Sequence, residues 1–460
     1  MILNIAPGSI PGLTQNEVQI FDELLQIYQA HLANNLEKEM YYEGAISLNS
    51  VNLGIALPNG IKKLEVGCAW GAKAVDVLAA RSMFDGFVGI DGRSVDNLAE
   101  IVDRNRLIPE YMKACREELK FGSTFATLSK DDKDKAKIRF HSPRYAAAKW
   151  DGVRNRISSG FAVIDTAPDN ETENMWVPSV INLYLDDQTI VFLRVGSSWG
   201  FRRVPHNLGR PLMEPLVHNA TTAKPFGRSR IKEPIRRLIQ GYVRTLANAT
   251  IGLEFATAPQ KYLLGITDEQ YDQVTQQKFN QYVGNILAAT TNPETGTAPT
   301  FGQLTQGSIA PHTEMLRILA SQFAAQTGLT VTDAGVVNDA NPTSSEAILA
   351  QSQTLVSMAE QLNAGNGDTL RTIALMALAI ERDCSIDDLP QEDLEIVAHF
   401  KNPAMPNVAV TADAAIKIAS AREGFAQTDT FLEMLGFSPA DIRRIKDQEP
   451  GTAPDDSPEA

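Results

Sequence analysis

The sequence predicts an α+β fold of several domains, in which a strand-rich module lies between helical segments. Three observations support this class. Residues 123–204 are rich in short strand-like runs, residues 229–255 carry a heptad-like apolar stripe, and residues 344–382 form a long helical segment after a polar loop. The 460 residues, 43% hydrophobic and 21% charged, are enough for about three packed domains.

Helical spacing of apolar residues characterises the N-terminal part of the chain. It runs from Gln15 to Tyr42, and Gly44 follows as a helix-ending residue. A second helix-like run covers Ala72 to Ser82. The segment from Asp96 to Phe121 has the same spacing, with Pro109 as a break. We therefore expect three helical segments before the strands.

The strand-rich module has β-branched and aromatic runs separated by turn residues. The runs cover residues 138–140, 161–164, 180–184 and 189–195. Polar turn segments such as Ser129–Lys133 and Pro168–Asn174 lie between them. Proline and glycine then interrupt regular structure from Pro205 to Gly227.

A helix is predicted over Ser229–Phe255, and Pro259 closes it. Its apolar residues are spaced four and three apart, which gives a heptad-like stripe too short for an independent coiled coil. The stripe consists of Ile235, Ile239, Tyr242, Leu246, Ala249 and Leu253. Residues 260–310 then return to short strands and turns.

The C-terminal half begins with a helix that Pro311 opens and that ends near Gly328. A polar loop follows over Thr330–Pro342. Thr343-Ser344-Ser345-Glu346 has the capping-box pattern, which predicts a long helix that reaches Arg382. Gly365-Asn366-Gly367 predicts a kink within that helix. A last helical region is expected over Ala412–Asp447, and the polar, proline-rich residues 449–460 are expected to be disordered.

Bulk charge argues against tight static binding of nucleic acid, because the formal net charge is −14. Three distant cysteines, Cys68, Cys115 and Cys384, form neither a disulfide framework nor a zinc spacing. The first residues lack the pattern of a signal peptide. The longest apolar run, Ala374–Ile380, is far shorter than the ~20 residues of a membrane span. We expect an intracellular protein that does not contact a membrane.

One glycine-containing segment, Leu64–Gly71, followed by Val88–Asp91, resembles the first two motifs of an S-adenosylmethionine-dependent methyltransferase. That enzyme class needs small residues where the backbone passes the cofactor. Here Ala69 and the bulky Trp70 stand at that position, and a strand module follows instead of alternating strands and helices. We favour a helix N-terminus with Trp70 in a core, and keep the methyltransferase as an alternative.

A second pattern, Gly196-Ser197-Ser198-Trp199-Gly200, matches the nucleophile elbow of hydrolases. An elbow requires a following helix, but Phe201–Pro205 does not have helical character, so we predict a glycine turn between strands. The six histidines have no metal-pair spacing, and no Walker A sequence occurs. We therefore predict no active site, no cofactor and no metal site.

A basic segment extends from Phe201 to Arg244, with ten basic residues against two acidic ones, a net charge of +8. Such runs most often form solvated faces or pair with acids elsewhere. We expect Arg228, Arg230, Arg236 and Arg237 to pair with acidic groups between subunits; contact with DNA is the alternative.

The order of several short motifs resembles the portal family of tailed double-stranded DNA bacteriophages. Each motif is weak alone, but their order and spacing extend over more than 300 residues, and this makes the resemblance specific. The matching elements are Tyr41-Tyr42-Glu43-Gly44, Trp70 to Arg81 with Phe84-Asp85-Gly86-Phe87, Asp103–Leu107, Phe121–Phe125, Ser142-Pro143 with Trp150-Asp151, Phe226–Ser229, Ala258–Tyr262 with Gly265, and Asn341-Pro342 with Ser345-Glu346-Ala347. Lys261 stands where the family usually has Arg.

The resemblance implies a domain organisation: an α/β wing, two stem helices, a small β-rich clip, a tunnel loop, a long kinked helix, a helical crown and a tail. The corresponding ranges are wing 1–228, stem helix 229–255, clip 256–310, second stem helix 311–327, tunnel loop 328–343, long wing helix 344–382, crown 383–448 and disordered tail 449–460.

The resemblance also implies function, partners and location. A portal is a non-enzymatic, dodecameric ring at one capsid vertex, assembled in the host cytoplasm, through which DNA is packaged and ejected. Its partners would be double-stranded DNA, the terminase large subunit, a head–tail adaptor and the major capsid protein. A generic capsid or scaffold protein remains an alternative.

Two sets of candidate site residues follow. The tunnel loop that touches DNA would present Thr332, Asp333, Asn338, Asp339 and Asn341. The stem and subunit interface would use Ile235, Ile239, Tyr242, Leu246, Leu253, Arg236 and Arg237.

Overall fold

The computed structural model contains mixed helix and sheet, 49% helical and 25% strand, consistent with a mixed α and β class. It describes residues 3, 5–45, 67–90, 95–168, 176–196, 198–257, 261–265, 296, 298, 300–303, 308–335, 345–404, 408–422, 424–435, 437, 442 and 445. The chain divides into two compact units, Met1–Lys401 and Asn402–Ala460.

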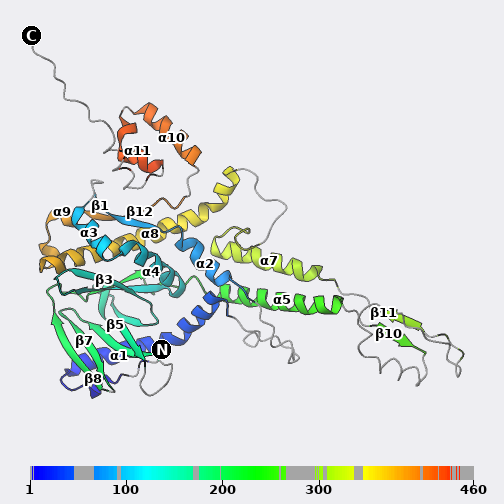
Figure 1. Ribbon diagram of the computed structural model, residues 1–460, viewed down its shortest axis with the longest axis horizontal. Helices are drawn as coiled ribbons and strands as arrows, with labels where there is room; N and C mark the ends of the chain where they lie inside the picture. The colour runs from blue at the N-terminus through cyan, green and yellow to red at the C-terminus, as the bar shows by residue number, and fades with distance from the viewer. Residues whose placement is uncertain are drawn as a thin grey trace, which may run out of the picture. The chain divides into compact units, whose positions relative to one another are not determined.

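Helix α1 (Gln15–Glu43) begins at a capping box, where Thr14 and Glu17 exchange hydrogen bonds. It ends at Gly44, whose φ of 70° is the left-handed conformation that suits glycine. The helix lies against a five-stranded antiparallel meander in the order β4-β5-β6-β7-β8 (Figure 1). These strands are β4 (Ala146–Asp151), β5 (Arg156–Pro168), β6 (Trp176–Tyr184), β7 (Gln188–Val195) and β8 (Ser198–Pro205).

The contact between α1 and the meander is aromatic. Phe21 stacks on Phe192 with ring centroids 5.0 Å apart, and Tyr28 meets Phe161 edge-on at 5.8 Å. These side chains belong to a separate hydrophobic cluster, distinct from the main core. The strand module predicted over 123–204 is thus confirmed, and α1 covers one face of its larger sheet.

The main core lies around a second sheet of order β3-β2-β9 and the helices packed on it. The strands are β2 (Ser123–Lys130), β3 (Ala136–His141) and β9 (Met213–Val217). The helices are α2 (Trp70–Ala79), α3 (Asp96–Arg104), α4 (Leu107–Phe121) and α8 (Ser345–Arg382). The break between α3 and α4 lies at Arg106, with φ 50°, and Pro109 lies in the first turn of α4, where proline is tolerated.

Helix α8 continues through Gly365-Asn366-Gly367, where the sequence predicted a kink. Asn366 is fully buried there and donates a hydrogen bond to Glu118 of α4. The predicted capping residues Thr343 and Ser344 lie outside the described residues. After α8 come two short helical segments, Ile386–Asp388 and α9 (Gln391–Leu394), and strand β12 (Ile396–Phe400).

Strand β12 pairs antiparallel with β1 (Phe84–Gly89), so a segment late in the sequence is joined to one in its first quarter. The boundary expected at residue 383 therefore does not coincide with the division of the chain, which falls after Lys401. The second unit contains α10 (Val408–Ala421), the short turn Phe425–Gln427 and α11 (Asp429–Met434). In its described residues, the helical region expected over Ala412–Asp447 contains two helices, α10 and α11, and Gly424 between them has a φ of 81°.

Candidate functional site

Two helices, α5 (Glu233–Thr257) and α7 (Ala310–Thr327), pack side by side and extend away from the sheets (Figure 1). At their far end lies a two-stranded sheet, β10 (Lys261–Leu264) with β11 (Thr300–Gln303). The helices run antiparallel and approach closely at Gly241, where an added Cβ would lie 3.4 Å from Leu319. Helix α5 begins four residues later than Ser229, the predicted start, and α7 begins at Ala310 beside the predicted Pro311. Most of the segment between β10 and β11 lies outside the described residues.

The predicted apolar stripe of α5 divides into two parts. Ile235 and Ile239 are buried, and Tyr242 and Leu246 are partly buried against the main core. Leu253, at the far end, is 48% exposed. Three further residues of α5 are buried although they are not in the predicted stripe: Leu238, Val243 and Ala247. A strict four–three spacing does not find these positions because the buried face of this helix is wider than a coiled-coil seam.

Trp70 joins the helix pair to the sheets. Its ring stacks on Phe323 of α7 at 4.6 Å and lies 4.4 Å from the ring of Tyr242 of α5. Its Nε1 donates to the carbonyl oxygen of Ala334 over 3.2 Å. The side chain is 5% exposed and stands at the N-terminus of α2, so the prediction of a helix start with a core tryptophan is confirmed.

The beginning of the predicted tunnel loop forms a defined turn over Thr330–Gly335. The Asp333 carboxylate accepts hydrogen bonds from the Thr330 amide (3.1 Å) and hydroxyl (2.8 Å), and the Asp333 amide donates to that hydroxyl (3.1 Å). Ala334 is buried, and Gly335 has a φ of 86°. The first residues of the predicted polar loop therefore include one, Ala334, that belongs to the main core.

Among the predicted tunnel residues, Thr332 is exposed and Asp333 is half-buried. Because its carboxylate already bonds Thr330, Asp333 holds the turn together. Asn338, Asp339 and Asn341 lie outside the described residues.

Arg230 is a buried residue at the end of the helix pair nearest the sheets. It is 7% exposed, and its guanidinium donates to the carbonyl oxygens of Ala74 in α2 and Thr327, the last residue of α7, the latter over 2.6 Å. A cation at a helix C-terminus satisfies carbonyl groups that lack an intrahelical partner. Burial lowers the pKa of Arg230 to about 10, so the side chain stays charged at neutral pH. The expected acidic partner from another subunit is wrong for this residue.

Four other basic residues of the segment pair with acids of the same chain. Arg236 contacts Glu37 of α1 and, at 3.0 Å, Glu233, which also binds Arg237 at 2.9 Å. Two further arginines, Arg203 and Arg210, pair with Glu17 and Glu214 respectively. Sequence alone identified the basic run but not Glu37 or Glu17, which lie far away along the chain.

Two further sequence predictions are tested by this geometry. The Gly196–Gly200 segment connects the antiparallel strands β7 and β8, so a strand, not a helix, follows the serines. Within the described parts of the chain, no three metal-ligating side chains cluster. No helix among the described residues has the length and apolar character to cross a membrane.

The contacts described so far are packing and capping contacts: the Trp70 ring lies against both helices of the pair, and Arg230 caps the end of α7. The chain belongs to the phage portal protein family, SPP1 Gp6-like, whose family model matches residues 22–454. It has a phage portal role and is a component of the virion in the head–tail connector. This family is structural and non-enzymatic.

Two curated relatives are similar over most of the chain. The portal protein of Mycobacterium phage L5 is 24% identical over 444 residues, 93% of this chain and 88% of the relative. The portal protein of Mycobacterium phage D29 is 24% identical over 438 residues, 92% and 87% of the two chains. Among solved structures, a chain from the neck of a native GTA particle is 12% identical with a TM-score of 0.46, covering 86% of this chain and 99% of that one.

Proposed function

We propose that twelve copies of this chain form a closed ring at one capsid vertex, through which double-stranded DNA is packaged and later ejected. The observation that carries this proposal is a set of exposed apolar side chains on both helices of the pair. Leu253 of α5 and Met315 and Ile318 of α7 are 48%, 44% and 46% exposed in a single chain. Exposed apolar residues on both helices are typical of an interface that neighbouring subunits complete.

The proposed domains follow the family resemblance, with one change. The wing covers 1–228, α5 and α7 are the two stem helices, the clip lies between them, and α8 is the long wing helix. The crown begins after Lys401, because β12 belongs to the first unit. In the stem, Leu246 and Leu253 contact a neighbouring subunit, whereas Ile235, Ile239 and Tyr242 contact residues of their own chain.

The tunnel loop is proposed to project into the bore from the anchored turn at Thr330–Gly335. Thr332, Asn338, Asp339 and Asn341 would then face DNA, and Asp333 would fix the loop at its base. Twelve copies at −14 each give −168. A like-charged wall holds phosphates weakly, which favours sliding over binding.

The ring is proposed to dock the terminase large subunit during packaging and a head–tail adaptor afterwards, and to contact the major capsid protein around the wing. It assembles in the host cytoplasm. These partners rest on membership of the family.

Negative-stain microscopy of the purified chain tests the ring. Particles with rotational symmetry and a central hole are the expected result. A population that remains monomeric at micromolar concentration in the presence of capsid protein would refute the proposal.

The loop is tested by the double substitution Asn338→Lys with Asp339→Lys, which leaves Asp333 and its turn intact. Rings should form normally, but DNA packaging should fall because added cations in every loop retain phosphates. The matched control, Asp132→Lys with Asn207→Lys, adds the same charge at two exposed positions without touching the loop. Normal packaging by the Asn338/Asp339 variant would remove this loop from the DNA path.

A further inference from the structure

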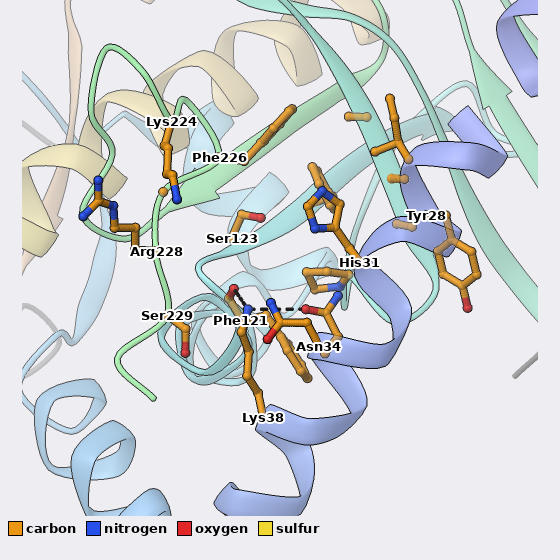
Figure 2. A pocket seen from close by; sticks show the side chains of 18 of the residues that line it. Tyr28, His31, Asn34, Lys38, Phe121, Ser123, Lys224, Phe226, Arg228 and Ser229 are labelled. Atoms are coloured by element: carbon orange, nitrogen blue, oxygen red, sulfur yellow. Dashed lines mark hydrogen bonds between the residues drawn. The ribbon is translucent and has the colours of Figure 1, made fainter. Parts of the chain in front are cut away.

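A cavity of about 470 Å³ lies between α1, the end of α4, strand β4 and the segment Lys224–Lys232 (Figure 2). Lys38 and His31 of α1 stand on one side, and Lys224 and Phe226 stand on the other. The floor is apolar and includes Phe121, Phe125 and Ile231. We call this cavity the basic pocket.

The charged residues that line the basic pocket are all cations: Lys38, Lys224, Arg228, Lys232 and Arg236. Arg236 has Glu37 and Glu233 as partners. Among the residues that the structure describes, no carboxylate lies within ion-pair distance of the other four. The pocket therefore concentrates positive charge in a chain whose net charge is −14.

Burial makes the positive charge of Lys38 energetically unfavourable. Its ammonium group donates to the carbonyl oxygen of Phe121 over 2.9 Å and to the Asn35 side chain over 3.4 Å, both neutral acceptors. Burial, followed by the charge of Arg236, lowers the pKa of Lys38 to about 8. The nearby charge of Glu37 opposes this shift only in part, so a carboxylate that reached Lys38 would stabilise its charged form further.

The wall that carries Lys224 and Arg228 is fixed in place. The Arg228 amide donates to the His218 carbonyl over 2.9 Å, and the Arg230 amide donates to the Leu119 carbonyl over 2.9 Å. Gly227 has a φ of 67°, and a Cβ there would lie 2.2 Å from the His218 carbonyl oxygen. The pocket is thus pre-formed, which reduces the entropy lost when a ligand binds.

A complementary surface exists in the same unit of the chain. Residues 383–395 contain six acids and no basic residue. One of them, Asp393, is buried and paired with Arg382. The other five are exposed and have no cationic partner within the described chain: Asp383, Asp387, Asp388, Glu392 and Glu395. We call this surface the acidic edge; it also carries the half-buried Ile386.

The two surfaces do not meet within one chain. The acidic edge lies around α9 at the C-terminal end of α8, away from the junction of α1 with α5 beside which the basic pocket opens (Figure 1). Complementary patches on different sides of one subunit create a head-to-tail interface, which closes into a ring when the rotation between subunits allows it.

We propose that the basic pocket of each subunit receives the acidic edge of a second copy of this chain. Carboxylates of Asp387 and Asp388 would neutralise Lys38, Lys224 and Arg228. A short acidic peptide segment fits a cavity of this size, whereas a DNA duplex would reach only the cations at its rim. The inference rests on the proposed ring and assigns one of its subunit contacts.

Charge reversal and charge exchange in the full-length chain test this contact. Lys224→Glu with Arg228→Glu should raise the protein concentration needed for half-maximal ring formation by about 100-fold or more, because like charges would then face each other. Asp387→Lys with Asp388→Lys should do the same. The chain with all four substitutions restores opposite charges and should assemble within about 10-fold of wild type. Sedimentation velocity gives the ring fraction, and circular dichroism checks the fold.

A matched control shows whether charge alone weakens assembly. Lys133→Glu with Lys137→Glu, an equal change of charge away from the pocket, should leave assembly unchanged. If the chain with all four substitutions is no better than either double variant, the pairing is wrong. If Lys224→Glu with Arg228→Glu forms normal rings but loses affinity for a 20-base-pair duplex, the pocket binds DNA and the proposal is overturned. Failure of the wild-type chain to form rings would instead count against the proposed function.

Discussion

The two ends of helix α5 differ in what surrounds their apolar residues. At the near end, Ile235 and Ile239 are buried among residues of their own chain, and Trp70 packs between the two helices. At the far end, Leu253 is about half exposed. The same helix therefore has one part whose packing is complete in a single chain and one part that is not.

This difference separates folding from assembly. Substitutions at the near end should lower the stability of the chain whether or not rings form. Substitutions at the far end should leave the single chain folded and weaken the ring. Variants of both kinds test this separation, from the largest expected effect on the chain to the smallest.

Trp70→Ala should reduce the free energy of unfolding by about 3–5 kcal/mol, because a buried aromatic ring and its contacts are lost. Urea denaturation of the non-assembled chain measures this. Trp176→Ala is the matched control: Trp176 is 58% exposed, so a loss of less than about 1 kcal/mol is expected. Equal losses would show that the near end does not depend on its buried tryptophan.

Glu118→Gln should change how stability depends on pH. Burial raises the pKa of Glu118 to about 8, with a smaller opposing effect of its hydrogen bond from Asn366. The unfolded chain loses this proton near the ordinary pKa, so wild-type stability falls as pH rises from about 4.5 to 8. Glutamine does not ionise, so the variant lacks this loss. The free energy of unfolding of the variant minus that of wild type should therefore be larger at pH 8 than at pH 4.5, by on the order of 3 kcal/mol.

Urea unfolding of both chains at several pH values between 4.5 and 8 provides the comparison. A constant difference between wild type and Glu118→Gln over that range would mean that Glu118 is ionised in the folded core. Glu110→Gln, on the same helix at a half-exposed position, is a suitable control and should produce no comparable change.

Leu253→Asp should leave the single chain within about 1 kcal/mol of wild type, because the side chain is already half exposed. Rings should nevertheless be lost or weakened, since a charge would enter each subunit contact. Leu246→Asp, closer to the body and partly buried, should affect both properties. Ring fractions from sedimentation velocity and melting temperatures of the single chains distinguish the two. Normal rings for Leu253→Asp would remove this residue from the interface.

Arg237→Glu should have the smallest effect on the chain, below about 1 kcal/mol, because its pair with Glu233 is exposed. Arg236→Glu should cost more, since that side chain is only 14% exposed and lies between Glu37 and Glu233. Thermal unfolding of each variant measures the difference. If Arg237→Glu weakens rings more than Arg236→Glu does, Arg237 contacts a neighbouring subunit.

Local signals in the sequence predicted the elements well. Glycine at position 44 and proline at 311 marked helix ends, and the spacing of apolar residues found α1, α5 and α7 within a few residues. The family was also predicted, because it depends on the order of motifs along the chain. The mixed α and β class followed from the same local patterns.

Partners distant in sequence could not be predicted. Nothing near Trp70 indicates that its indole bonds Ala334, and nothing near Arg236 indicates Glu37. The role of Asp333 in DNA contact followed from the family resemblance and from its polarity. Its hydrogen bonds to Thr330 are instead a local motif that the spacing of the two residues allows. Polar residues in a loop resemble each other in sequence whether they face solvent or fix a turn.

The pairing of β1 with β12 constrains the order in which the chain can fold during translation. Phe84 pairs with Phe400, so β1 leaves the ribosome long before its strand partner is made. Until then its edge stays open, and Phe84 lacks the edge-on contact with the Phe400 ring. The first unit can close only when translation has passed residue 400, since long-range pairing waits for the later strand. Nascent chains that stop short of β12 should therefore be the species most dependent on chaperones and most accessible to proteases.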